Sequence, residues 1–241
     1  TEADADVCEA VDFLEYYGRE MIRLATPRRM GRVPGELSHL WYEPRGVAAV
    51  IAPWNFPLAI SMGMTSAAVV TGNPVVYKPA SQSPVIGSMI AEIFREADLP
   101  PGVFNFVPRP GSELGDVLAT HPDVALVAFT GSKAVGLEII EKAARVPAGS
   151  ACVKNVIAEM GGKNAVIVDA DADLDEAVVH IVRSAFGYQG QKCSACSRLI
   201  VLEENCERLL ERLKAAVQSL HLGPPEDPKN FVGAVIEPAD R

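Results

Sequence analysis

A cysteine in a polar turn rich in glycine is the residue of this chain best suited to covalent chemistry. Cys193 lies within residues 186–198 (FGYQGQKCSACSR), between a run with helical spacing at 177–185 and an apolar run at 199–202 that predicts a buried strand. Side chains at such junctions are held in place by the flanking elements and carry function more often than core residues do. The thiol is therefore a candidate nucleophile, with a buried structural thiol as the alternative.

Two further side chains could complete the chemistry that a thiol begins. Glu159 follows the apolar run 156–158, and a carboxylate there can take a proton from water. Asn55 lies between Pro53 and Pro57, after an apolar run at 47–52. Its amide could donate to a developing oxyanion, a contribution worth about 3 to 4 kcal/mol where the donor is preorganised. By residue type alone, Asn55 could equally be a polar turn cap and Glu159 a solvated charge.

A third group of residues could bind an anion. Residues 128–136 (AFTGSKAVG) run from an apolar strand through Thr130, Gly131 and Ser132 into a helix, which presents free N–H groups and the positive end of a helix dipole. This suits a pyrophosphate, although the pattern is not G-x-G-x-x-G. Residues 77–81 (YKPAS) end another strand, and residues 111–115 (GSELG) resemble a second loop of this kind or an ordinary turn.

Strands and helices alternate along most of the chain. We expect strands at 47–52, 74–77, 103–107, 124–129 and 156–158, and helices near 61–70, 84–97, 113–119 and 134–144. This alternation predicts an α/β fold with a parallel sheet. A second α/β pattern begins near Glu159, with a strand at 165–168 and a helix after Asp173. An amphipathic helix at 3–24 and a connector with one hairpin strand near 38–42 come first, so we divide the chain into 1–45, 46–159 and 160–241.

Composition excludes several classes of protein. The net charge is −9 without a basic stripe, which argues against a nucleic-acid partner. No apolar run is long enough to span a bilayer and no secretory pattern opens the chain, so we expect a cytoplasmic protein without membrane insertion. Cys193 and Cys196 form a C-x-x-C, but neither a second pair nor a nearby histidine completes a zinc site, and we expect no metal.

Taken together, the separated motifs PWNFP (53–57), YKPAS, FTGSK (129–133), EMGGKN (159–164) and GQKCSACSR resemble the aldehyde dehydrogenase superfamily over nearly the whole chain. The last motif is most similar to the branch that oxidises L-glutamate γ-semialdehyde, the 1-pyrroline-5-carboxylate dehydrogenases. The resemblance implies a Rossmann-like dinucleotide-binding domain followed by the first part of a catalytic domain.

The resemblance also implies residue roles. Cys193 is the nucleophile, Glu159 the general base and Asn55 the oxyanion donor. Substrate contacts fall on Phe56, Lys192 and Ser194, with Ser194 helping to hold the α-carboxylate of glutamate semialdehyde. Contacts to NAD fall on Pro53, Trp54, Lys78, Ser81, Gly111, Gly115, Thr130, Gly131 and Ser132.

The cofactor expectation has one open alternative. Ser81 stands where many family members have a glutamate that repels a 2′-phosphate, so NADP is an alternative to NAD.

Other interpretations are left open as well. The substrate could be a different aldehyde, including that of an acylating or succinate-semialdehyde type, although Glu159 argues against an acylating enzyme. The chain could instead be a cofactor-binding module without catalysis. It begins without Met and ends in a linker-like phrase, and we interpret it as part of a longer chain whose full-length form is a homo-oligomer, either a separate enzyme or one fused to a proline dehydrogenase.

Overall fold

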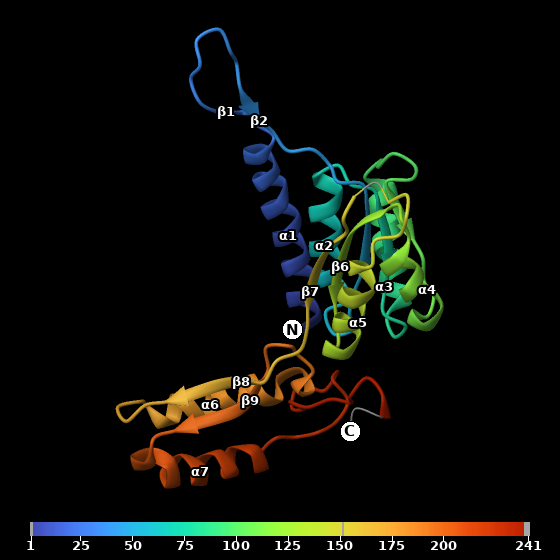
Figure 1. Cartoon of the computed structure of the whole chain (residues 1–241). Helices are drawn as coiled ribbons and strands as arrows, with labels where there is room; N and C mark the ends of the chain where they lie inside the picture. The colour runs from blue at the N-terminus through green and yellow to red at the C-terminus, as the bar shows by residue number, and fades with distance from the viewer. Residues whose placement is uncertain (1, 151, 239–241) are drawn as a thin grey trace. The chain divides into compact units, whose positions relative to one another are not determined.

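The computed structural model describes residues 2–150 and 152–238. The chain divides between Met160 and Gly161 into two compact units (Figure 1). Each unit has its own apolar core, and each is described below by itself.

Unit 1 is built on a parallel five-stranded sheet with the order β5-β4-β3-β6-β7. The strands are β3 (Val47–Ile51), β4 (Val75–Lys78), β5 (Phe104–Phe106), β6 (Val124–Thr130) and β7 (Asn155–Glu159). Four of the five residues of β3 are buried, as the continuous apolar run of a strand covered on both faces requires. The predicted α/β fold with a parallel sheet is confirmed.

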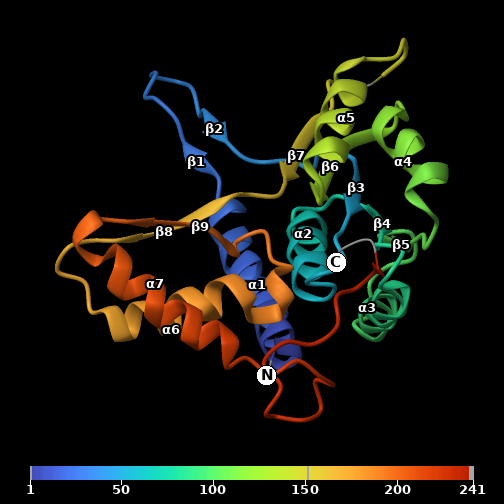
Figure 2. The ribbon, with the colours of Figure 1, turned by 90° about the horizontal axis from the view of Figure 1, so that it is seen from below.

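Helices cover both faces of this sheet. Side chains of α1 (Glu2–Leu24), α2 (Ala59–Val70) and α3 (Pro84–Glu96) pack in one core cluster, and those of α4 (Gly111–Thr120) and α5 (Lys133–Ala144) pack in the other. Figure 2 shows α2 and α3 on one side of the strands and α4 and α5 on the other. The unit is therefore a three-layer α/β/α structure.

The chain reverses direction across the sheet at β3. It moves outward from β3 through β4 to β5, and then returns to place β6 against the free side of β3. In open parallel sheets, ligands bind outside the carboxyl ends of the strands at this kind of switch point. The order of strands therefore indicates a candidate ligand site at the residues that follow β3 and β6.

The first residues of unit 1 form a long helix and a short hairpin. Helix α1 packs along α2, and beyond it β1 (Arg28–Arg29) pairs antiparallel with β2 (His39–Leu40). The hairpin strand expected near 38–42 is present as β2, and both strands of the hairpin are exposed. In the described part of the chain, no helix has the length and apolar character that crossing a membrane requires.

Unit 2 is a smaller α/β layer pair. Strands β8 (Asn164–Val168) and β9 (Cys196–Val201) are parallel neighbours. Helices α6 (Leu174–Phe186) and α7 (Glu203–Gln218) pack side by side against one face of the pair (Figure 2). A short 3₁₀ segment, η1 (Gly187–Gly190), connects α6 to the turn that carries Cys193.

Three details differ from the sequence interpretation. The strand expected at 199–202 is not buried: Ile200 in β9 is 51% exposed, because the described helices of unit 2 cover only one face of the two strands. Residues 111–115 open helix α4 rather than forming a loop. Helix α7 was not predicted at all, although its apolar residues recur at helical spacing on the side that faces β8 and β9.

Candidate functional site

The candidate residues of unit 1 meet at one edge of the sheet. Lys78, Ile51, Phe129 and Ala158 lie in one row across four neighbouring strands, because each is the registered partner of the next. The residues that follow this row on every strand therefore emerge at the same edge. They include the loop that carries Asn55, the Thr-Gly-Ser turn after β6, and Glu159 at the end of β7.

The Asn55 loop is held at both ends. At its start, the Ala52 N–H donates to the Lys78 carbonyl over 3.1 Å. At its end, α2 has no side-chain cap of its own, and the Asp6 carboxylate of α1 accepts from the N–H groups of Leu58 and Ala59, both at 3.1 Å. A carboxylate suits this place because it satisfies two free donors and complements the helix dipole. The half-buried residues 53–57, with Pro53, Trp54 and Phe56 among them, are thus fixed between two anchors.

Lys78 is a buried cation at this edge. Its side chain is 6% exposed, and its Nζ donates to the Pro79 carbonyl over 2.9 Å. Burial lowers the pKa of the Lys78 ammonium, because removal from water penalises the charged form. Gly111 lies beside it: a Cβ on Gly111 would be 3.8 Å from Lys78 Cε. Ser81 is exposed in the turn that follows, and Gly115 lies one turn into α4.

The turn after β6 joins a helix start to the strand end that carries Glu159. The Ser132 hydroxyl accepts from the Val135 N–H over 3.4 Å and caps α5. The Gly131 N–H donates to the Glu159 carbonyl over 3.1 Å, so the turn and the end of β7 are linked through the backbone. A Cβ on Gly131 would lie 2.6 Å from the Phe129 ring, and this explains the need for glycine there.

These features fit a dinucleotide with two phosphates. The capped start of α5 offers backbone N–H groups and the positive end of a dipole. The Lys78 ammonium adds a fixed positive charge at the same edge. The Glu159 side chain is exposed at this edge, where water can reach its carboxylate.

Unit 2 places Lys192, Cys193 and Ser194 on one turn. The turn is closed by the Ala195 N–H, which donates to the Lys192 carbonyl over 3.1 Å. Cys193 and Ser194 are both exposed, and the Lys192 ammonium lies 5.6 Å from the centre of the Tyr188 ring. The second cysteine differs: Cys196 is only partly exposed, and its Sγ lies 3.2 Å from the Arg198 carbonyl, to which it donates. Cys193 is the more accessible thiol of the pair.

The backbone before this turn is strained. Tyr188 and Gln189 have φ of 54° and 58°, and Gly190 follows with φ of 69°. For residues other than glycine, this left-handed region costs roughly 1 to 2 kcal/mol each. The Gln191 side chain anchors the end of the segment, since its Oε1 accepts from the Ile236 N–H over 2.9 Å. Such strain concentrates at functional turns.

Sequence reasoning missed two residues that hold these loops. Asp6 was assigned only to an amphipathic helix, and its contact with the start of α2 spans 52 positions. Asn164 was quoted in a motif without a role, yet its amide contacts the carbonyl of Cys193, 29 positions later. A polar residue opening an apolar strand was the available signal for Asn164.

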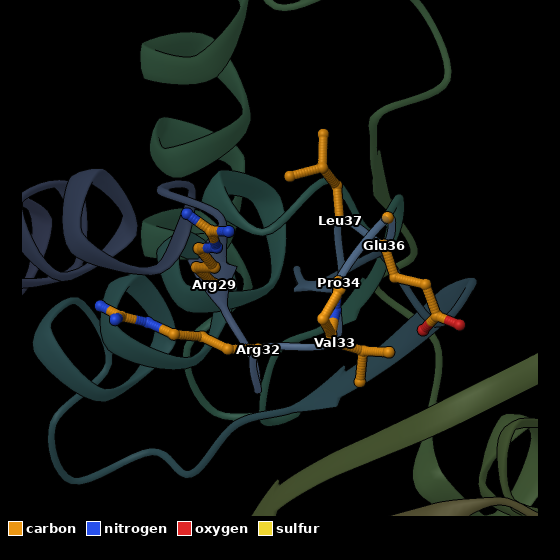
Figure 3. A pocket seen from close by; sticks show the side chains of 7 residues that line it. Arg29, Arg32, Val33, Pro34, Glu36 and Leu37 are labelled. Atoms are coloured by element: carbon orange, nitrogen blue, oxygen red, sulfur yellow. The ribbon is translucent and has the colours of Figure 1, made fainter.

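A separate hollow lies in the β1–β2 hairpin. Figure 3 shows the guanidinium groups of Arg29 and Arg32 on one side of the connecting loop and the Glu36 carboxylate on the other. None of the residues predicted for chemistry lines this hollow. Within residues 2–150 and 152–238, no group of three or more His, Cys, Asp or Glu side chains is arranged to hold a metal ion.

Comparison with known proteins gives a consistent result over the whole chain. The sequence model described as the aldehyde dehydrogenase family matches residues 1–241. The chain is 50% identical over 236 residues to the 1-pyrroline-5-carboxylate dehydrogenase of Geobacillus thermodenitrificans, which covers 98% of this chain and 46% of that protein. It is 49% identical over 238 residues to the enzyme of the same name from Bacillus subtilis, covering 99% and 46%. The chain thus spans about half the length of these curated relatives.

Solved structures agree. A 1-pyrroline-5-carboxylate dehydrogenase from Thermus with bound NAD matches with a TM-score of 0.95 and 46% identity, over 99% of this chain and 46% of that one. Proline utilization A from Bdellovibrio bacteriovorus, inactivated by N-propargylglycine, matches with a TM-score of 0.96 and 53% identity, over 99% of this chain and 25% of that one.

Proposed function

This chain belongs to the aldehyde dehydrogenase family, and on that premise we propose that the protein containing it oxidises L-glutamate γ-semialdehyde to L-glutamate with NAD. One observation carries the proposal. Identity of about 50% to 1-pyrroline-5-carboxylate dehydrogenases extends over 98% of the chain, and that stretch includes the exposed Cys193 and the residues flanking it. With this substrate, the reaction would be a step in proline breakdown.

In the proposed reaction the Cys193 thiolate attacks the aldehyde carbon. A C–S bond forms, and the electron pair of the carbonyl moves onto oxygen. The Asn55 amide and the Cys193 backbone N–H donate hydrogen bonds to that oxyanion. When bound, NAD would accept the hydride that leaves this carbon. The carbon, still bonded to the Cys193 sulfur, would then be a thioester.

Hydrolysis of the thioester completes the reaction. The Glu159 carboxylate takes a proton from water while the water oxygen attacks the thioester carbon. The C–S bond then breaks, the carboxylic acid leaves, and the Cys193 thiolate is restored. Glu159 then releases its proton to solvent. The sum is consumption of one aldehyde and one water, transfer of one hydride and release of one proton.

Cofactor binding in this proposal uses the sheet edge of unit 1. The start of α5, with Thr130, Gly131 and Ser132, would hold the pyrophosphate, and Lys78 with Ser81 would face the adenosine ribose. NAD is bound by the Thermus enzyme of the same fold, and that supports NAD as the main cofactor. Ser81 offers no carboxylate against a 2′-phosphate, and so NADP would be a second cofactor.

The decisive experiment uses the full-length protein. NADH formation should be measured with glutamate γ-semialdehyde, succinate semialdehyde and an uncharged aldehyde of similar length. The proposal expects the highest kcat/KM for glutamate γ-semialdehyde. A preference for another aldehyde would retain the chemistry but replace the substrate, and inactivity with all three would leave a cofactor-binding protein.

A second measurement tests the order of steps. In Glu159→Gln, the first turnover should be faster than steady state, because hydride transfer precedes the hydrolysis that needs the base. A burst of NADH should therefore appear at mixing. A wild-type steady-state rate in this variant would remove Glu159 from the mechanism.

A further inference from the structure

A single asparagine holds the backbone of the nucleophile turn. The Asn164 Nδ2 donates to the Cys193 carbonyl over 2.7 Å and to the Ala195 carbonyl over 3.2 Å. An amide nitrogen carries two N–H groups, so one side chain can serve both acceptors. Asn164 is the first residue of β8, which places its side chain on a hydrogen-bonded strand rather than on a mobile loop.

The local backbone is arranged around this contact. Asn164 pairs with Cys196 in register, but the next residue pairs with Arg198, so Ser197 is an extra residue in β9. Bulges of this kind redirect a chain and are frequent beside active sites. A Cβ added to Gly162 would lie 3.1 Å from Asn164 Oδ1 and 3.3 Å from the Cys193 carbonyl oxygen. The glycine leaves the space in which amide and carbonyl meet.

The two acceptors flank the chemistry of the turn. Fixing the carbonyls of Cys193 and Ala195 sets the planes of the 193–194 and 195–196 peptides. The Ala195 N–H, which donates to the Lys192 carbonyl, fixes the 194–195 peptide between them and closes the turn. The directions of the Cys193 thiol and the Ser194 hydroxyl follow from those planes. We propose that Asn164 is a positioning residue that orients the nucleophile; this inference rests on the proposed role of Cys193.

A matched asparagine in the same unit provides the control. Asn205 of α7 donates through its Nδ2 to the carbonyls of Asp169 (2.8 Å) and Ala170 (3.0 Å), just beyond the other end of β8. The two side chains thus make the same double contact at opposite ends of one strand. Asn205 is 5% exposed and Asn164 is exposed, so removing Asn205 should cost at least as much stability. Only Asn164 holds a residue proposed to react.

The experiment compares Asn164→Ala with Asn205→Ala in the full-length protein. Asn164→Ala should lower kcat on the order of 10- to 100-fold, because a small displacement of a reacting group has effects of this size. The single-turnover rate of hydride transfer should fall equally and show an isotope effect with deuterated aldehyde. The Kd for NAD should stay within about twofold, since the residues proposed to bind NAD lie in unit 1. Asn205→Ala should lower stability to urea but leave the single-turnover rate within about twofold.

A third variant tests the hydrogen-bond donor itself. Asn164→Asp keeps the shape of the side chain but replaces the donor with an acceptor facing two carbonyl oxygens, and should be slower than Asn164→Ala. The inference is overturned if Asn164→Ala has the wild-type single-turnover rate, or if both alanine variants lose rate equally. Cys193→Ala, measured in parallel, separates the premise: an inactive Cys193→Ala with an unaffected Asn164→Ala refutes only the positioning role, whereas an active Cys193→Ala refutes both.

Discussion

The two parallel sheets of this protein, that of unit 1 and that of unit 2, differ in how many of their faces helices cover. In unit 1, β3 and β6 lie between two layers of helices, and most of their side chains are buried. Among the described residues of unit 2, the helices that pack on β8 and β9 are α6 and α7. Val168 is the one buried residue of the two strands, and Ile167 is 73% exposed. The residues proposed for cofactor binding lie at the first sheet, and the proposed nucleophile lies beside the second. A sheet covered on both faces thus provides a rigid scaffold. The turn beside a sheet covered on one face needs side-chain hydrogen bonds of its own to hold it.

The largest effect should separate covalent attack, proposed for unit 2, from cofactor binding, proposed for unit 1. Cys193→Ala in the full-length protein should lower turnover at least about 1,000-fold, because it removes the thiol proposed to form the covalent bond. NAD binding should survive, since its proposed residues lie in unit 1. Turnover with aldehyde and fluorescence titration with NAD measure the two. Cys196→Ala, the control, should keep substantial activity, and the reverse pattern would transfer the nucleophile to Cys196.

A pair of core variants tests the one-sided packing of unit 2. Leu209 in α7 is 1% exposed, and Leu209→Ala should lower the free energy of unfolding by about 2 to 5 kcal/mol through lost burial and a cavity. Ile167→Ala, on the open face of β8, should change it by no more than about 0.5 kcal/mol. Urea unfolding of this 241-residue chain measures both. Equal losses would break the comparison, because Ile167 would then have to be covered in solution.

Recognition of the substrate's α-carboxylate should also belong to unit 2. Ser194→Ala should lower kcat/KM for glutamate γ-semialdehyde by roughly 10- to 100-fold, the worth of one hydrogen bond to a carboxylate. An uncharged aldehyde of similar length should lose much less. Steady-state kinetics with both substrates provides the measurement. Similar losses would mean that Ser194 only shapes the turn.

Cofactor choice should belong to unit 1. Ser81→Glu should weaken NADP binding relative to NAD by about tenfold, because a carboxylate beside a 2′-phosphate is a like-charge contact, whereas a 2′-hydroxyl can donate to it. The two dissociation constants, measured in wild type and variant, give the ratio. An unchanged ratio would place Ser81 outside the ribose site.

The smallest effect concerns the buried cation of unit 1. Burial lowers the pKa of Lys78 in the folded state, so between that value and the ordinary lysine value near 10.4 the unfolded chain binds more protons. The contribution of Lys78 to stability should therefore rise with pH through this window. Lys78→Met should flatten that rise in urea unfolding followed from neutral to alkaline pH, and the exposed Lys214→Met should not.

Much of the framework could be predicted from the sequence because the periodicities are local. Each predicted element is specified by residues that lie within a few positions of one another. Examples are the apolar runs at 47–52 and 124–129 and the helical pattern at 134–144. The same patterns placed Glu159 at a strand end and Cys193 between a helix and a strand, where the structure has them.

The remainder depends on distant partners. Whether Ile200 is buried depends on which faces the helices cover, and no local pattern of β9 records that. The contacts of Asp6 with α2 and of Asn164 with Cys193 join residues 52 and 29 positions apart. Short polar side chains such as these read locally as caps or solvated groups, so their role becomes visible only in three dimensions.

The position of β3 in the sheet has a consequence for the time course of synthesis. Its second partner, β6, begins at Val124, 73 positions after β3 ends at Ile51. At a synthesis rate of 5 to 20 residues per second, one side of β3 (VAAVI) stays unpaired for about 4 to 15 s. An unpaired edge of this kind is a template for wrong pairing. The experiment compares two ribosome-arrested chains, one that ends before residue 124 and one that has emerged beyond residue 130. The shorter chain should retain more of a chaperone that binds unfolded apolar segments. Equal retention would show that β4 and β5 alone protect the strand.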